Sequence, residues 1–247
     1  MVTDTQKLSV KIFTLFPEMF PGHLGQSLSG KALEKGIWSL ETVTPRTFTT
    51  DAHKTVDDAP FGGGAGMVLK ADVLDRTLQA HQPLGRFIYM TPRGTPLTQQ
   101  KAQELAKEPR LSILCGRYEG VDERLLEAYA PEEISIGDYV LSGGEQAAMI
   151  LLDAVIRLLP DVVGNAGTHD EESFTNGLLE YPHYTRPAAW TGPDGVERKA
   201  PEILSSGHHA KINEWRLEKA KEVTRARRPD LWDAYLLQNP EESKKTK

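Results

Sequence analysis

Cysteine is nearly absent from the sequence: Cys115 is the single one among 247 residues. One cysteine excludes a disulfide framework and any metal site built from several thiolates. Because Cys115 lies in the apolar run LSILCG, we expect a small core residue and not a nucleophile. The histidines form no HExxH pattern and no HxE pattern followed by CxxC, so the sequence predicts no protein-bound metal.

Long apolar runs are also missing, since no stretch reaches the roughly 20 residues that a membrane helix needs. The first residues, MVTDTQKLSVKIF, contain no apolar signal core with a cleavage site. We therefore expect a cytoplasmic protein with no membrane partner. A chain of 247 residues, 39% hydrophobic and 26% charged, favours one large globular domain with a smaller second one.

An excess of positive charge is absent too, because the formal net charge is -6, which argues against a wholly basic nucleic-acid-binding surface. The distribution is nevertheless uneven. Residues 211–228 carry seven basic and three acidic side chains, a net charge of +4, which leaves -10 for the rest. By composition alone, a solvated helix face with paired charges is the simpler interpretation, and a phosphate-binding element is the alternative.

What the chain does contain is a regular alternation of strand-like and helical segments. Such alternation indicates βαβ units and a mostly parallel sheet. The loops 91–94, 115–120 and 136–145 each follow a strand, so they converge at the carboxyl edge, where open α/β sheets bind ligands. The predicted strands are 9–16, 86–91, 111–116 and 132–137, and the predicted helices are 29–36, with Ser29 as its N-cap, 98–108, 121–130 and an apolar helix ending at Pro160.

Glycines gather in these loops and in PFGGGAGM (60–67), but no stretch matches a phosphate-binding P-loop or a dinucleotide fingerprint. Bare backbone can hydrogen-bond the edge of an adenine, while Ile136, Val140 and Leu141 would sandwich its ring. The loops therefore favour an adenosyl ligand without phosphates. S-adenosylmethionine is one such ligand, although spacing alone does not single it out.

Six motifs carry a resemblance that extends over almost the whole chain. The chain resembles the bacterial tRNA (guanine-N1)-methyltransferases of the TrmD type. The motifs are TLFPEMF (14–20), TVDDAPFGGGAGM (55–67), CGRYEGVDER (115–124), SIGDYVLSGGE (135–145), YPHYTRP (181–187) and SGHHAKINEWR (206–216).

This resemblance implies an α/β fold of the SPOUT class, a parallel sheet with a deep trefoil knot, plus a small, mainly helical C-terminal domain. It implies a cofactor-binding catalytic domain over 1–162, a linker over 163–178 and a tRNA-binding domain over 179–247. The implied partners are tRNA and a second copy of the chain, in a homodimer with shared active sites. The implied reaction is S-adenosylmethionine-dependent methylation of N1 of guanosine 37, next to the anticodon, which supports reading-frame maintenance.

Four residues take catalytic roles by this resemblance. N1 of neutral guanine carries a proton, so a base must remove it while a cation stabilises the charge that grows on O6. Arg157 matches the arginine proposed to stabilise O6, and Glu119 matches a carboxylate that contacts the guanine. Where the family usually has aspartate before Ser-Phe, this chain has Glu172, our candidate for the base, with Asp170 as the alternative. From composition alone, Arg157 could instead be a helix C-terminal cation, and the acids could simply solvate a linker.

The remaining site residues are also implied by the resemblance. The expected residues for S-adenosylmethionine are Tyr89, Met90, Thr91, Pro92, Gly116, Gly120, Ser135, Ile136, Gly137, Asp138, Tyr139, Val140, Leu141, Gly143 and Gly144. The expected tRNA-binding residues are Asp57, Gly66, Arg117, Arg186, Arg225, Arg227 and Arg228. A dependence on Mg²⁺ carries over as an expectation, through Glu119 or Glu172, without a ligand cluster in the sequence.

Two other classes stay open from the residues alone. A non-catalytic RNA-binding or assembly factor could use the same scaffold, although Glu119, Arg157 and an acid before Ser173 count against it. A nucleotide-dependent oxidoreductase is disfavoured by the failed dinucleotide fingerprint.

Overall fold

The computed structural model describes residues 7–163 and 172–245. The chain divides into two compact units, Met1–Gly164 and Asn165–Lys247, and each is described by itself. The prediction for Asp170 lies outside the described residues.

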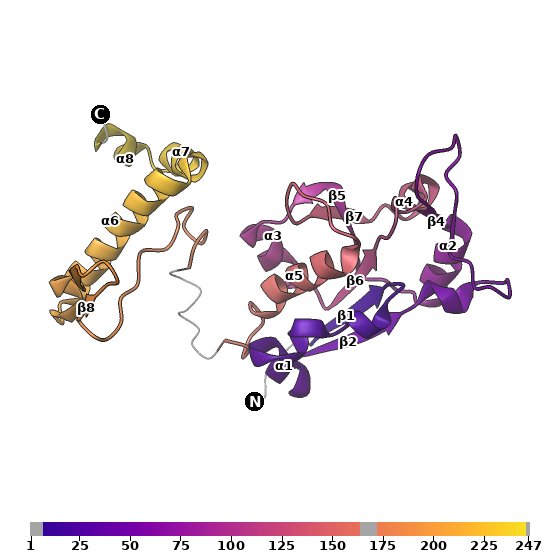
Figure 1. Ribbon diagram of the computed structural model, residues 1–247, viewed down its shortest axis with the longest axis horizontal. Coiled ribbons are helices and arrows are strands. Elements are labelled where there is room, and N and C mark those ends of the chain that lie inside the picture. The colour runs from indigo at the N-terminus through magenta and orange to yellow at the C-terminus, as the bar shows by residue number, and fades with distance from the viewer. Residues whose placement is uncertain (1–6, 164–171, 246–247) are drawn as a thin grey trace. The chain divides into compact units, whose positions relative to one another are not determined.

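The first unit is built on a five-stranded sheet in the order β2-β1-β6-β5-β7, and every neighbouring pair is parallel (Figure 1). This confirms the parallel sheet that the alternating pattern predicts. The central strand, β6, is buried along almost its whole length, which explains its nearly continuous apolar sequence. The strands are β1 (Leu8–Phe13), β2 (Trp38–Val43), β5 (Arg86–Pro96), β6 (Arg110–Cys115) and β7 (Glu132–Ser135).

Helices cover both faces of this sheet, as the two hydrophobic clusters of the first unit show. One cluster joins α1, α3 and α5 to one face, and the other joins α2 and α4 to the opposite face. A two-stranded ribbon of β3 (Asp57–Asp58) and β4 (Val68–Leu69) precedes α2. The helices are α1 (Ser27–Glu34), α2 (Ala71–Ala80), α3 (Gln99–Leu105), α4 (Glu123–Tyr129) and α5 (Gly144–Ile156), with 3-10 turns at Pro17–Met19, Gly22–Gly25 and Pro45–Phe48.

Side-chain caps fix two of these helices. Thr98 accepts a hydrogen bond from the Lys101 amide at 3.1 Å, and Asp122 accepts one from the Arg124 amide at 3.0 Å. The predicted cap at Ser29 is wrong, because α1 begins two residues earlier, at Ser27. Ser29 instead donates its hydroxyl to the Gln26 carbonyl at 3.1 Å, a bond that a serine in a first helical turn can make.

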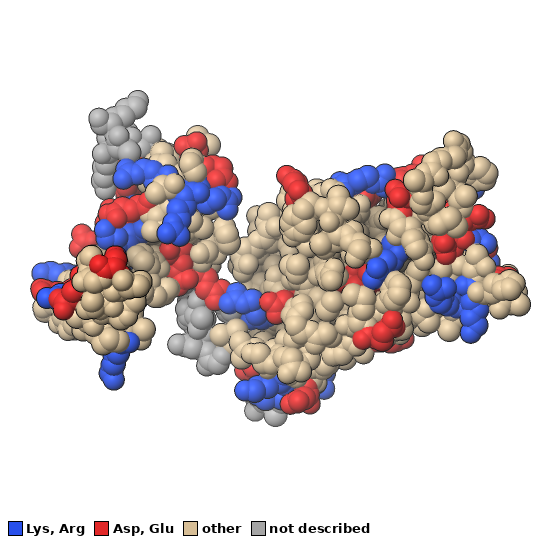
Figure 2. Space-filling view, in the orientation of Figure 1, with Lys and Arg blue, Asp and Glu red and all other residues tan. Residues whose placement is uncertain are grey.

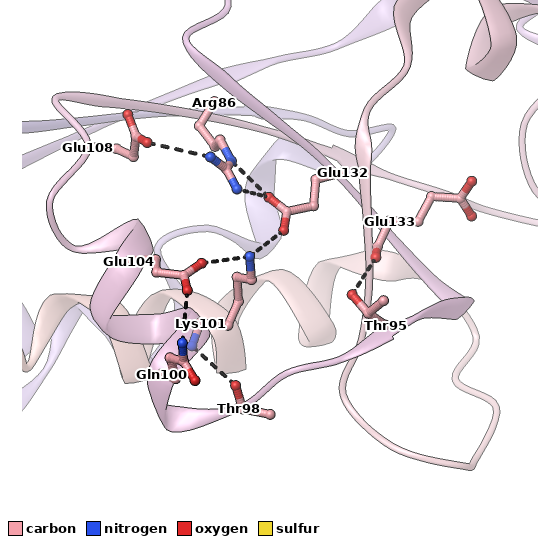
Figure 3. A network of polar contacts seen from close by, with 9 residues as sticks. All are labelled: Arg86, Thr95, Thr98, Gln100, Lys101, Glu104, Glu108, Glu132 and Glu133. Carbon is pink, nitrogen blue, oxygen red and sulfur yellow. Dashed lines mark hydrogen bonds and ion pairs between the residues drawn. The ribbon is translucent and has the colours of Figure 1, made fainter. Parts of the chain in front are cut away.

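A charged network occupies the amino edge of the sheet, where β5 and β7 begin (Figure 3). Glu132 lies 2.8 Å from Arg86 and 2.7 Å from Lys101, which also pairs with Glu104 at 2.8 Å. Burial by itself raises the pKa of Glu132, but the hydrogen bonds from Arg86 and Lys101 outweigh it and leave that pKa lowered. These charged side chains therefore pair with one another at the amino edge of the sheet, the edge opposite to the glycine-rich loops.

The second unit packs α6 (His209–Arg227) against α7 (Pro229–Gln238), with α8 (Pro240–Lys245) following. Its small core is formed by Leu178, Ala220 and Trp232. Buried Thr224 accepts a hydrogen bond from the Leu179 amide at 2.8 Å, which fastens the incoming chain to α6. A hairpin of β8 (Ala189–Thr191) and β9 (Glu197–Lys199) and a 3-10 turn at Glu202–Ser205 complete the unit.

Candidate active site

A pocket of about 220 Å³ lies along the middle of β5, beside the ends of β6 and β7 and the start of α5. Every residue that the sequence predicts for the methyl donor lines it, except Asp138. The segment between β7 and α5 forms one wall of the pocket. In this wall Val140 is 86% exposed and Tyr139 is 53% exposed, so the pocket is open to solvent on this side. Six further residues line the pocket without having been predicted for the donor: Ile134, Ser142 and Ala147, together with Arg117, Tyr118 and Glu119 from the loop after β6.

Two of the glycines are required by contacts between loops. A Cβ at Gly144 would lie 2.9 Å from the Cys115 Cα, and a Cβ at Gly143 would lie 2.6 Å from the Arg117 Cζ. The Gly144 amide donates to the Gly116 carbonyl at 2.9 Å. Bare backbone at 143 and 144 thus lets the wall after β7 lie directly on the loop after β6, a reason the sequence alone did not reveal.

Tyr89 forms the floor under the two glycines of the loop after β6. Its hydroxyl would lie 2.9 Å from a Cβ at Gly116 and 3.1 Å from a Cβ at Gly120. The residue is 5% exposed, and burial raises the pKa of its phenol. The phenol is therefore neutral at physiological pH and closes the bottom of the pocket as an uncharged group.

Glu119 stands on the pocket wall beside the glycine-rich segment 60–67. Its amide donates to the Met67 carbonyl at 2.9 Å, and the Leu69 amide donates to the Gly120 carbonyl at 2.9 Å. Asp57 is paired with Leu69 in the ribbon of β3 and β4. The structure therefore brings Glu119 next to the segment that holds Gly66, and close along the ribbon to Asp57.

Arg117 turns inward. Its Nε lies 2.9 Å from one oxygen of Glu145 and donates to the other at 3.1 Å, while Nη1 donates to the Ser142 carbonyl at 3.2 Å. The side chain of Arg117 is 16% exposed, and that of Glu145 is 1% exposed. Sequence reasoning missed Glu145, although an acid at the start of an otherwise apolar helix is a usable signal.

Of the other predicted catalytic residues, Arg157 does not line this pocket, and Glu172 lies in the second unit. Arg157 caps the far end of α5, whose first residue, Gly144, lines the pocket. Glu172 belongs to the second unit, where it lines a smaller cavity of about 160 Å³ together with Tyr181 and Arg216. In that cavity the Arg216 guanidinium lies 4.9 Å from the centre of the Tyr181 ring.

The predicted tRNA-binding arginines of the second unit are exposed, but they differ in their partners. Arg228 is held by Asp230 through hydrogen bonds of 2.6 and 2.9 Å. Arg225 and Arg227 lie in the last turn of α6 and Arg186 lies before the hairpin, all three exposed to solvent. On the face drawn in Figure 2, basic and acidic side chains of this unit are intermixed.

Within residues 7–163 and 172–245, no three acidic, histidine or cysteine side chains lie close enough to hold a metal ion. Over the same residues, no helix combines the length and apolar character required to cross a bilayer.

These observations define an α/β protein with a glycine-lined small-molecule site at the carboxyl edge of a parallel sheet. Comparison with known proteins narrows the class. The family model of the tRNA (Guanine-1)-methyltransferase TrmD matches residues 8–234. The chain belongs to this family, which confirms the family and the enzyme class that the motifs predict.

Curated relatives agree with the family model. The tRNA (guanine-N(1)-)-methyltransferase of Rhodospirillum rubrum is 58% identical over 93% of this chain and 94% of its own length. Proteins of the same name from Mesorhizobium japonicum and Sphingopyxis alaskensis are each 58% identical, over 92% and 90% of this chain and 97% and 90% of their own lengths.

Proposed function

We propose that this chain transfers the methyl group of S-adenosylmethionine to N1 of guanosine 37 of tRNA in the cytoplasm, and so supports reading-frame maintenance. Family membership supports the reaction type. The observation that carries the proposal is the pocket, because fourteen residues predicted for the donor from separate segments of the chain line one cavity. A random set of loop residues would not converge in this way.

The pocket suits an adenosyl group by its chemistry. Its lining includes the backbone of 135–137 and 142–144 and the apolar side chains of Ile136, Val140 and Leu141. Backbone groups can read the edge of an adenine, while apolar side chains cover its faces. S-adenosylmethionine, when bound there, supplies an electrophilic methyl group on a sulfonium.

The protein's side chains would handle the proton and the charge of the guanine. Glu172 removes the N1 proton, with Asp170 as the alternative base, and Glu119 accepts hydrogen bonds from the N1 or N2 hydrogens. Arg157 donates to O6, where negative charge accumulates as the proton leaves. A planar guanidinium suits that oxygen better than an ammonium, because it is always charged and offers a fixed fork of donors.

Two subunits would have to share each site. Helix α5 has 13 residues, so Arg157 lies roughly 20 Å along its axis from the pocket end of the same helix. A guanidinium cannot span that distance to a guanine beside its own chain's pocket. Arg157 therefore acts at the pocket of a second copy, which supports the proposed homodimer. We also propose that the first unit forms the deep trefoil knot that the resemblance to the family implies.

Recognition of tRNA would fall to the C-terminal domain. We assign it to residues 179–247, joined by the linker 163–178 to the catalytic domain over 1–162, with Arg186, Arg225 and Arg227 as exposed cations. Asp57 and Gly66 would lie near the target base, since their segment adjoins Glu119. Positive side chains that meet phosphates release counterions, so binding should weaken as salt rises.

A dependence of the activity on Mg²⁺ stays a prediction from the resemblance to the family. The described residues offer no ligand cluster, so no step of the reaction is derived through a metal ion.

The deciding experiment maps the methylated nucleoside. Transcript tRNAs with and without guanosine 37 are incubated with protein and S-adenosylmethionine, digested and analysed by mass spectrometry. The proposal requires 1-methylguanosine from the first transcript and none from the second. In parallel, S-adenosylmethionine and its demethylated product should raise the melting temperature, and NAD should not.

A further inference from the structure

A fully buried acid lies behind the wall of the pocket. Glu145, in the first turn of α5, is 0% exposed and follows the pocket residue Gly144. At the end of β1, Thr14 donates its hydroxyl to Glu145 Oε1 at 2.7 Å. An ionised carboxylate inside a protein is costly unless it is paired and hydrogen-bonded, so its partners matter for the geometry around it.

Arg117 is the partner that carries the positive charge. It reaches Glu145 through Nε at 2.9 Å and the Ser142 carbonyl through Nη1 at 3.2 Å. One guanidinium therefore joins the buried acid to the backbone of the pocket wall. It also occupies the space that a Gly143 side chain would need, so the guanidinium lies directly against the backbone of the pocket wall.

The N-terminal motif TLFPEMF surrounds this guanidinium. The Phe16 ring lies under it, with 4.2 Å between Cζ and the ring centre, and Met19 Sδ lies 3.4 Å from Nη2. The Phe16 amide donates to the Thr14 hydroxyl oxygen at 2.9 Å, which fixes the hydroxyl that binds Glu145. The motif thus contacts both members of the ion pair, Arg117 through Phe16 and Met19 and Glu145 through Thr14.

We propose that Arg117 is a positioning residue for the methyl-donor pocket. Held by Glu145, which Thr14 holds in turn, and by the Phe16 ring, it fixes the Ser142 carbonyl and the bare backbone of 143–144 against the loop after β6. The inference rests on the proposed function, since it takes the pocket to be the donor site. It assigns Arg117 a different role from the tRNA contact that the sequence predicts.

The test measures donor affinity in the absence of tRNA. S-adenosylmethionine is titrated calorimetrically into the full-length protein and into Arg117→Gln, Glu145→Gln and the double variant. Each single variant should bind about tenfold more weakly, and the double variant no more weakly than the singles, because the two residues act as one unit. Arg93→Gln is the matched control, because this arginine follows the pocket residue Pro92 in β5 without lining the pocket, and its pair with Glu123 at 3.0 Å is exposed.

A second measurement separates positioning from tRNA contact. If Arg117 only positions the wall, Arg117→Gln leaves the salt dependence of tRNA binding unchanged, whereas a lost phosphate contact reduces the slope by about one. Unchanged donor affinity in Arg117→Gln, or a reduced salt slope, overturns the inference. If the full-length protein binds no S-adenosylmethionine, the proposed function itself fails.

Milder variants cover the case in which a buried charge change prevents folding. Thr14→Val removes the hydroxyl that binds Glu145 at nearly constant shape, and Phe16→Leu removes the ring under Arg117. With a melting temperature close to that of the parent, both should still weaken donor binding by about threefold. Parental donor affinity in both variants would also overturn the inference.

Discussion

Gly66 lies directly against the carboxylate of Glu119. A Cβ at Gly66 would be 2.8 Å from the Glu119 Cδ, and the φ angle of Gly66 is +89°, a conformation that side chains rarely adopt. The glycine-rich segment therefore provides the space in which the carboxylate of Glu119 stands on the pocket wall.

Gly66→Ala should displace Glu119 and slow methyl transfer. We expect kcat/KM for tRNA to fall about tenfold, roughly the effect of losing one hydrogen bond to a charged group. Gly62→Ala is the matched control, because its φ angle is +88° and a Cβ there meets nothing within 4 Å. Equal losses in the two variants would attribute the effect to backbone strain and not to Glu119. The measurement is the steady-state rate at saturating S-adenosylmethionine with transcript tRNA as the varied substrate, which gives kcat/KM for both variants.

Glu172→Ala should abolish most proton abstraction from N1. Removing a general base typically costs 10²- to 10⁴-fold, so single-turnover methyl transfer should slow by about that factor. Asp170→Ala should slow the reaction by only a few fold, and Glu171→Ala is the neighbouring acid that controls for loss of charge. Full activity in Glu172→Ala with a large loss in Asp170→Ala would reassign the base to Asp170.

Arg225 and Arg227 should contribute more to tRNA binding than Arg228 does. The sequence offers three similar cations, but Arg228 is already held by Asp230. Arg225→Gln combined with Arg227→Gln should reduce the slope of log K against log salt by about two, and Arg228→Gln by less than one. Donor affinity should stay at the parental value in both. Filter binding at several salt concentrations measures the slopes, and an identical slope in all variants would leave α6 as a solvated surface.

Much of the first unit could be predicted because its strands and helices are local patterns. β6, β7 and α5 match their predicted segments, since a buried parallel strand is a short apolar run and α5 is a long one. β5 begins at Arg86 as predicted, but the loop predicted over 91–94 is wrong, because the strand continues to Pro96 after an irregularity in its pairing with β7 between Met90 and Thr95. Helix α2 was missed although Val73, Leu74 and Leu78, its buried apolar residues, lie at helical spacing.

The order of the strands and the role of the pocket glycines could not be predicted. β6 lies between β1 and β5, a neighbourhood set by contacts between residues far apart in the sequence. Likewise, Gly143 and Gly144 are explained by Arg117 and Cys115, which approach them only in the folded chain. The converging loops could be predicted, because the carboxyl ends of parallel strands share one edge.

The network around Glu132 should make the first unit sensitive to acid. The pKa of Glu132 is lowered from its ordinary value of 4.5, because the hydrogen bonds from Arg86 and Lys101 outweigh the effect of burial. A carboxyl whose pKa is lower in the folded state stabilises the fold above its unfolded pKa. That contribution is lost as the pH falls through the folded value, so the sensitive window lies below about pH 4.5.

Glu132→Gln should therefore lower the free energy of unfolding by about 1 kcal/mol at pH 7, a modest value because Arg86 is 40% exposed. The difference from the parent should shrink as the pH falls below 4. Glu108→Gln is the control, since this acid lies farther from Arg86, at 3.7 Å, and should change stability by less than about 0.5 kcal/mol. Urea unfolding at pH 7 and pH 3.5 measures both, and a difference that persists undiminished at pH 3.5 would contradict the electrostatic origin.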